Sequence, residues 1–218
     1  MEKKNYLTAN TKNKIQRWLR RLAPYQKLYR QLDFTANNSA LLVIDMQGFF
    51  LDNTSHAFVP AAATIIPNVR KLVDTFREKR GMVVFTKYVG TRKNSNMMTR
   101  WWKHCVLKTE DVEIADELKP RPQDVVIEKD SYSAFHNTDL EAILLKHNIR
   151  NVIIAGVVTN LCCETAAREA FTHGFSVVFS MDATASYNEE LHFSSLITLA
   201  HGFSLMRTTE QIIGRLNK

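Results

Sequence analysis

One cysteine stands where an apolar run gives way to a helical pattern. The apolar run Val152–Ala155 is followed by the segment Gly156–Ala170, which contains Cys162. This order predicts a buried strand, then a turn, then a helix that begins at Cys162. Free N–H groups and a partial positive charge at a helix N-terminus favour a thiolate and can hold the oxyanion formed by its attack. We therefore expect a nucleophile with a lowered pKa, which reacts with iodoacetamide well below about pH 8.

Two charged residues also stand at the ends of apolar segments. Asp45 follows Ala40–Ile44, and Lys129 follows Val125–Glu128. In a parallel α/β sheet the carboxyl ends of the strands share one edge, and ligands bind in the crevice there. We therefore expect an acid, an ammonium group and a thiol to converge at that edge, which is the geometry that covalent catalysis requires.

Apolar strand patterns and helical patterns alternate from residue 40 to the end of the chain. We expect strands at 40–45, 82–87, 124–128, 151–156, 175–180 and 203–206, and helices at 60–80, 139–147, 162–173, 189–200 and 210–216. This alternation predicts an α/β fold with three α/β/α layers, a mainly parallel, Rossmann-like sheet and right-handed crossovers. Residues 88–110 show no clear period and, with residues 50–57, are expected to form the loops that determine specificity.

The positive charge of the chain is concentrated at its beginning. The formal net charge is +7; residues 1–33 hold nine Lys or Arg and two acidic residues, and the remaining 20 basic and 20 acidic residues cancel. We expect a basic N-terminal arm over residues 1–36 and one α/β domain over residues 37–218. Because that domain is nearly neutral, nucleic acid is not expected as a partner or substrate.

The arm has an apolar stripe at helical spacing. Ile15, Trp18, Leu19 and Leu22 follow the i, i+3, i+4, i+7 pattern, which recurs after Pro24 at Tyr25, Leu28, Tyr29 and Leu32. The pattern predicts two short amphipathic helices that dock on the domain of the same chain or on a second subunit. Alternatively, the arm contacts a membrane surface, an acidic partner or nucleic acid, or it is a transit peptide.

Composition also bears on the compartment. The sequence has no apolar run near the roughly 20 residues that a membrane-spanning helix needs, so no transmembrane segment is expected. Its three cysteines, Cys105, Cys162 and Cys163, form no disulfide framework and indicate free thiols. A reducing, cytoplasmic location is therefore expected.

Together the motifs resemble those of the isochorismatase-like cysteine hydrolase superfamily, which includes nicotinamidases and related amidohydrolases. The resemblance runs from about Ala40 to the C-terminal helix. It rests on Leu42–Gln47 with Phe50, on Lys129–Phe135, on the cysteine segment and on Gly174–Ala183, in that order along the chain. Hydrolysis of a C–N bond in a small amide, carbamoyl or ureido compound is the activity that the resemblance implies.

The resemblance also implies roles for individual residues. Asp45, Lys129 and Cys162 would form a catalytic triad, with Cys162 carrying the acyl group as a thioester. A cis peptide bond would join Val157 to Val158, and the N–H groups of Val158 and Cys162 would form the oxyanion hole. Homo-oligomers, dimers or tetramers, are common in the family and are expected here.

Two other functions remain open at this stage. The first is an isochorismatase-type vinyl ether hydrolase, which uses acid chemistry. Its activity would survive the loss of Cys162 but not the loss of Asp45. A binding protein on the same fold would have no activity and would use the arm to engage its partner.

Aromatic residues near the triad in sequence are candidate pocket walls. Phe50, Tyr132 and Phe135 could sandwich a flat substrate or belong to the core. Trp101 and Trp102 lie in the irregular segment and are candidates for a pocket lid or a subunit contact. All five are tentative substrate-binding residues.

Metal ligands are where the sequence departs from nicotinamidases, which carry an Asp-x-His motif after the first catalytic strand. Here Asp52-Asn53-Thr54 has threonine in place of that histidine, and the other histidines show no ligand spacing. We therefore expect no catalytic metal and no cofactor.

Overall fold

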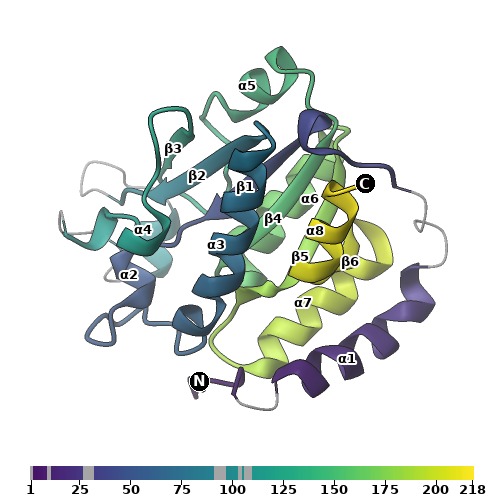
Figure 1. Cartoon of the computed structure of the whole chain (residues 1–218). Helices are drawn as coiled ribbons and strands as arrows, with labels where there is room; N and C mark the ends of the chain where they lie inside the picture. The colour runs from purple at the N-terminus through teal and green to yellow at the C-terminus, as the bar shows by residue number, and fades with distance from the viewer. Residues whose placement is uncertain (1, 9–10, 27–31, 91–96, 103–104, 106–109) are drawn as a thin grey trace.

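The computed structural model of the chain describes residues 2–8, 11–26, 32–90, 97–102, 105 and 110–218. Within these residues the strands form one six-stranded parallel sheet in the order β3-β2-β1-β4-β5-β6 (Figure 1). The strands are β1 (Ser39–Ile44), β2 (Met82–Tyr88), β3 (Val125–Lys129), β4 (Asn151–Val157), β5 (Ser176–Ala185) and β6 (Leu205–Arg207). The predicted α/β class is confirmed.

Helices cover both faces of this sheet. Helices α3 (Ala62–Glu78) and α8 (Thr209–Leu216) contact each other and β5, while α6 (Glu164–Thr172) and α7 (Glu189–Gly202) contact each other on the other side (Figure 1). Helix α5 (Leu140–Lys146) joins β3 to β4. The short helix α4 (Met97–Trp101) falls in the segment expected as a loop at 88–110, and α2 (Gly48–Leu51) overlaps the start of the one expected at 50–57.

The burial of the strands explains why the sequence pattern identified them. Every residue of β1 and of β4 is buried, because these central strands are covered on both faces, so they read as continuous apolar runs. Edge strand β3 instead alternates between buried and more exposed residues, and its Val126 is 43% exposed. Continuous apolar runs in the sequence therefore identify the central strands of the sheet.

The N-terminal arm packs on the domain of its own chain. Helix α1 (Thr11–Leu22) lies beside α7, with Ile15, Trp18 and Leu22 buried (Figure 1). The Trp18 ring stacks on Phe193 with 5.9 Å between ring centres. Tyr25, where the second predicted helix begins, lies in a 3-10 turn over Ala23–Gln26, and residues 27–31 of that helix lie outside the described residues.

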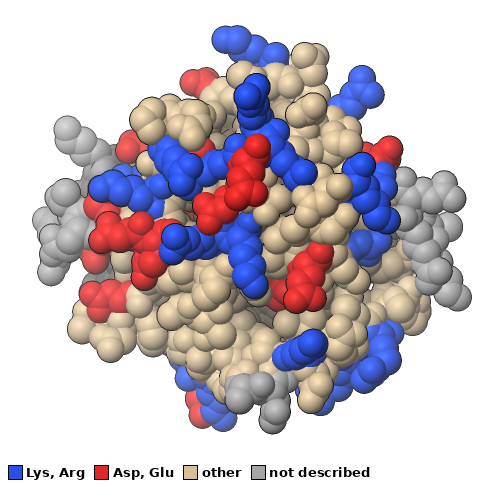
Figure 2. All heavy atoms as spheres, viewed as in Figure 1, with Lys and Arg blue, Asp and Glu red and all other residues tan. Residues whose placement is uncertain are grey.

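Charges on the surface are mixed. Figure 2 shows basic and acidic side chains interspersed on the face that carries α3, with further Lys and Arg side chains at the edge where α1 lies. Among the described residues, no helix has both the length and the apolar character to cross a membrane.

Candidate active site

The crevice of this sheet opens between β1 and β4, where the strand order reverses direction. In doubly wound sheets, ligands bind outside the carboxyl ends of the strands at this point. Asp45 follows the last residue of β1, and Cys162 lies in the turn that follows β4. Lys129 is the last residue of β3, two strands away from β1, so its long side chain must reach across the end of β2.

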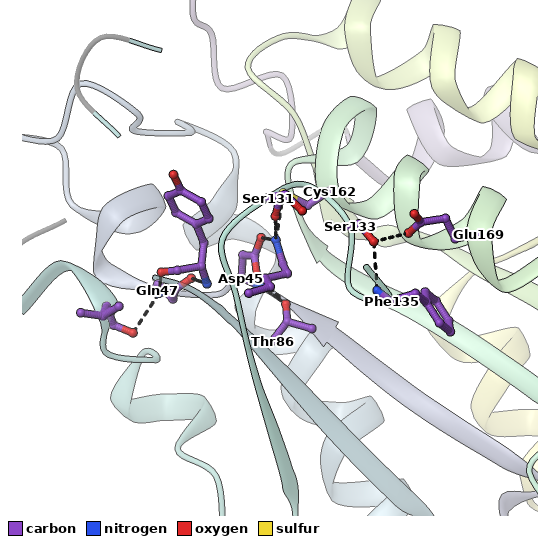
Figure 3. Close-up of polar contacts among 11 residues, drawn as sticks. Asp45, Gln47, Thr86, Ser131, Ser133, Phe135, Cys162 and Glu169 are labelled. Atoms are coloured by element: carbon purple, nitrogen blue, oxygen red, sulfur yellow. Dashed lines mark hydrogen bonds and ion pairs between the residues drawn. The ribbon is translucent and has the colours of Figure 1, made fainter. Parts of the chain in front are cut away.

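Asp45 turns sharply out of β1. Its φ of 48° lies in the left-handed region, which Asp tolerates better than most residues do. The Thr86 hydroxyl donates a hydrogen bond to Asp45 Oδ1, and the Asp45 N–H donates to Thr86 Oγ1 at 3.1 Å (Figure 3). The second carboxylate oxygen, Oδ2, accepts no aligned hydrogen bond from the described residues and faces the Lys129 ammonium at 2.7 Å. One oxygen is therefore held in place, while the other is available for a proton.

The Lys129 ammonium lies at the centre of the cluster. Its Nζ is 2.7 Å from Asp45 Oδ2 and 3.5 Å from Cys162 Sγ, and it donates to the Ser131 carbonyl oxygen at 2.8 Å. Burial alone lowers the pKa of Lys129, but the Asp45 carboxylate and the Cys162 sulfur outweigh burial and raise this pKa above its usual value. Lys129 thus remains an ammonium ion between an acid and a sulfur.

The turn that carries Cys162 differs from the expected helix start. Residues Thr159–Cys163 form one π-helical turn, and α6 begins only at Glu164. The peptide bond between Val157 and Val158 is cis. Since π-helical turns place a side chain out of the usual helical spacing, this turn directs Cys162 toward the crevice.

Gly156 allows β4 to approach β1 at this place. Its φ is 113°, and a Cβ atom there would stand 2.1 Å from the Ile44 carbonyl oxygen. Ile44 is the residue before Asp45, so the two backbones that carry the acid and the thiol touch where only glycine fits.

The expected lowering of the Cys162 pKa is wrong. Burial raises the pKa of Cys162 to about 12; the Asp45 carboxylate adds to this rise, and the Lys129 ammonium opposes it. Cys162 is 4% exposed, so the loss of hydration outweighs the effect of the turn. The resting side chain is therefore a thiol, and a base must take its proton when it attacks.

A cavity of about 120 Å³ lies above Cys162. Its described walls are mostly apolar and come from Lys3, Phe49, Phe50, His56, Ala57, Tyr88, Met98, Trp102, Cys105, Tyr132, Val158, Leu161, Cys162 and Tyr187. The Trp102 indole N–H donates to the Tyr132 hydroxyl and so ties two of these walls together. The cavity can hold a small, flat molecule next to the thiol.

Three of the five predicted wall residues line this cavity, and two do not. Phe50, Trp102 and Tyr132 are on its wall. Phe135 is instead buried beneath His173, with 5.0 Å between the two ring centres. Its N–H donates to the Ser133 hydroxyl oxygen at 3.0 Å (Figure 3).

The other exception is Trp101, whose side chain is 72% exposed and does not line the cavity. Trp101 is the last residue of α4, and Trp102 follows it with its N–H still donating to the Met98 carbonyl oxygen at 2.9 Å, as in a helix. Consecutive residues of a helix point about 100° apart, so the two rings face different directions.

Several residues of the site were not singled out from the sequence. Tyr88 ends β2 and Tyr187 follows β5, so the strand-end rule that identified Asp45 would also have found them. The buried Thr86 lies two residues before Tyr88, on the same side of β2, and no feature of the sequence marks it separately. Lys3 carries none either, because its place depends on the docking of the arm.

Gln47 holds the walls in position. Its side-chain oxygen accepts from the Tyr88 N–H at 2.8 Å, and its side-chain nitrogen donates to the carbonyl oxygens of Tyr88 at 3.1 Å and Val112 at 2.9 Å. This buried amide ties the segment after β1 to the end of β2 and to the loop before β3.

The segment where nicotinamidases carry a metal motif makes a turn here. Asp52 Oδ1 accepts hydrogen bonds from the N–H and the hydroxyl of Thr54, each at 2.8 Å. Within the described ranges, no group of three or more His, Cys, Asp or Glu side chains is placed to hold a metal ion.

Comparison with known proteins identifies the family of the chain. The isochorismatase domain model matches residues 39–211. The chain is 41% identical over 182 residues to nicotinamidase 3 of Arabidopsis thaliana, covering 81% of this chain and 88% of that relative. It is 32% identical over 179 residues to the ureidoacrylate amidohydrolase RutB of Yersinia enterocolitica, covering 69% and 76%.

A solved structure shares the fold over most of the chain. A cysteine hydrolase from Pseudomonas syringae superposes with a TM-score of 0.81 and 28% identity, covering 86% of this chain and 96% of that one. By its sequence match over residues 39–211 and by this fold, the chain belongs to the isochorismatase family.

Proposed function

We propose that this protein hydrolyses a C–N bond of a small amide, carbamoyl or ureido compound through a thioester at Cys162. The observation that carries the proposal is the buried cluster in which Lys129 Nζ lies 2.7 Å from Asp45 and 3.5 Å from the Cys162 sulfur. Such a cluster, beneath an apolar cavity, suits attack on a carbonyl carbon.

The first half of the reaction forms the acyl-enzyme. Asp45 Oδ2 takes the proton of the Cys162 thiol as the sulfur attacks the carbonyl carbon, and Lys129 stabilises the sulfur as its charge develops. The N–H groups of Val158 and Cys162 bind the oxyanion, and one such donor typically contributes about 3 kcal/mol to lowering the barrier. Asp45 then returns its proton to the nitrogen, the C–N bond breaks, and ammonia or an amine leaves.

The second half restores the thiol. Asp45, now ionised, takes a proton from water, and the hydroxide attacks the thioester carbon. The same N–H groups bind the second oxyanion. The C–S bond then breaks, and the proton on Asp45 returns to the Cys162 sulfur. The net reaction consumes one water and releases a carboxylic or carbamic acid.

The relatives support this class of substrate. One is a ureidoacrylate amidohydrolase, which suits the ureido compounds of the proposal. Nicotinamide is the second candidate, because the relative at 41% identity is a nicotinamidase and the aromatic cavity suits a flat ring. The turn at Asp52 and Thr54 offers no support for a metal-dependent version of that activity.

Ammonia release from a panel of small amides and ureas tests the proposal. Cys162→Ala should abolish turnover with the fold intact by circular dichroism, while Cys163→Ala, at the neighbouring buried thiol, should retain most of it. Full turnover by the Cys162→Ala protein would overturn the thioester route. Vinyl ether cleavage that survives Cys162→Ala but not Asp45→Asn would favour isochorismatase-type chemistry instead.

We also propose that the protein is cytoplasmic, as its free cysteines indicate, and that it is a homo-oligomer, a dimer or tetramer, as the family resemblance implies. Light scattering coupled to size-exclusion chromatography measures the assembly, and a mass of about one chain would contradict it.

A further inference from the structure

The beginning of the chain lies at the mouth of the cavity above Cys162. Lys3 lines this cavity and is the one Lys, Arg, Asp or Glu among its described lining residues. Its ammonium donates to the carbonyl oxygens of His56 at 2.6 Å and Phe58 at 3.0 Å. It also lies 4.6 Å from the centre of the Tyr187 ring. A single positive charge is therefore held on an otherwise apolar wall.

The segment that carries Lys3, residues 2–8, is called the strap. It is hydrogen-bonded to two segments of the domain, one of which lines the cavity. The Lys4 N–H donates to the Tyr187 carbonyl oxygen at 2.8 Å, and the Asn5 side chain donates to the Thr64 hydroxyl at 3.3 Å. The strap thus bridges the segment after β5 and the start of α3, and these hydrogen bonds fix the position of Lys3.

The strap also reaches the turn of the nucleophile. Tyr6 is 6% exposed, and its hydroxyl oxygen accepts a hydrogen bond from the Ser186 N–H at 2.9 Å. The Ser186 hydroxyl in turn donates to the side chain of Asn160, two residues before Cys162. Hydrogen bonds therefore connect the strap to the turn that carries Cys162.

The charge of Lys3 is not matched within the described residues. Lys4 pairs with Glu2 at 2.9 Å and Lys14 pairs with Glu189 at 2.6 Å, but no described carboxylate pairs with Lys3. The two carbonyl oxygens occupy two of its three N–H groups and leave one for a ligand. Lys3 is exposed overall, and the partial burial of its ammonium group lowers its pKa.

We propose that Lys3 binds a carboxylate of the substrate and makes the enzyme selective for small amides and ureides that carry one. The inference rests on the proposed C–N hydrolysis at Cys162. The substrate spans the cavity, with its C–N bond at the thiol and its carboxylate at the mouth. A charge-assisted hydrogen bond is stronger than a neutral one, and the apolar walls beside Lys3 offer the carboxylate no other charged partner among the described lining residues.

Two probes that differ only at the charged end test this inference. In n-propylurea a methyl group stands where 3-ureidopropionate has its carboxylate. We expect kcat/KM to be at least about tenfold higher for 3-ureidopropionate. Lys3→Gln should raise KM for that compound about tenfold with kcat within about twofold, and should leave n-propylurea unchanged. Lys3→Arg should restore part of the preference, and Lys4→Gln should match the unmodified protein.

Binding separates this inference from the proposed function. Calorimetric titration of the Cys162→Ala protein with each probe requires no turnover. Tighter binding of 3-ureidopropionate that is lost in Cys162→Ala/Lys3→Gln supports the inference, even if neither compound is hydrolysed and the proposed function fails. Equal binding of the two probes, or an equal loss of both in the Lys3→Gln protein, would show that Lys3 only holds the strap and would overturn the inference.

Discussion

The Lys129 ammonium lies 2.7 Å from the Asp45 carboxylate, and neither side chain exposes any surface to solvent. Removing one member of a buried ion pair leaves the other charged and unsolvated. Each charge in this cluster therefore depends on its partner for stability as well as for chemistry.

Replacing Lys129 tests both dependences. Lys129→Gln should lower the free energy of unfolding by about 3–5 kcal/mol, because the Asp45 carboxylate would be buried without its partner. The variant should also lose amide hydrolysis. Urea denaturation measures the first effect, and Lys146→Gln on the exposed side of α5 is the control. Similar unfolding midpoints for the two variants would contradict the buried pair.

The reaction of Cys162 with iodoacetamide should follow its raised pKa. Because that pKa is about 12, the thiolate fraction should rise about tenfold for each pH unit from 7 to 10, with no plateau in that range. Mass spectrometry of the Cys162 peptide at a series of pH values measures the rate. A fast rate that levels off below about pH 8 would mean that the turn lowers the pKa after all.

Removing the Asp45 charge should shift the same curve. In Asp45→Asn the Lys129 ammonium remains while the neighbouring anion is gone, so the Cys162 pKa should fall by about 1–3 units. Alkylation at pH 7 should therefore become faster while hydrolysis is lost. Slower alkylation in this variant would indicate that Asp45 does not act on the sulfur through its charge.

Gly156 should tolerate no side chain. Gly156→Ala would place Cβ 2.1 Å from the Ile44 carbonyl oxygen at a φ of 113°, so we expect a loss of stability on the order of 3 kcal/mol or more. Gly214→Ala in α8 is the matched control. Its Cβ would meet nothing within 4 Å, and the change should stabilise the helix by about 0.5–1 kcal/mol. Thermal unfolding of both variants measures the contrast.

Substitutions at Tyr132 and Phe135 should separate an effect on substrate binding from an effect on stability. Tyr132→Phe removes the hydroxyl that accepts from Trp102 on the cavity wall and should raise KM several-fold with little change in stability. Phe135→Leu should instead cost about 1 kcal/mol of stability with KM unchanged, since Phe135 packs on His173. A higher KM in Phe135→Leu would mean that Phe135 contacts the substrate.

The sequence by itself determined the fold class and the three residues of the central cluster. After their polar first residues, Ser39 and Asn151, strands β1 and β4 carry no polar side chain because both of their faces are covered, so their ends could be located within a residue or two. The carboxyl ends of parallel strands share one edge of the sheet, and this rule predicts that Asp45, Lys129 and Cys162 lie close together.

Only the tertiary structure decided how each side chain behaves at that edge. The Cys162 pKa depends on burial and on charges far away in sequence, so the helix-start pattern predicted its direction wrongly. Trp101 and Trp102 are adjacent in sequence but face different surroundings. Lys3 reaches the cavity because Trp18 and Tyr6 dock the arm, and such contacts between distant segments depend on the packed chain rather than on local pattern.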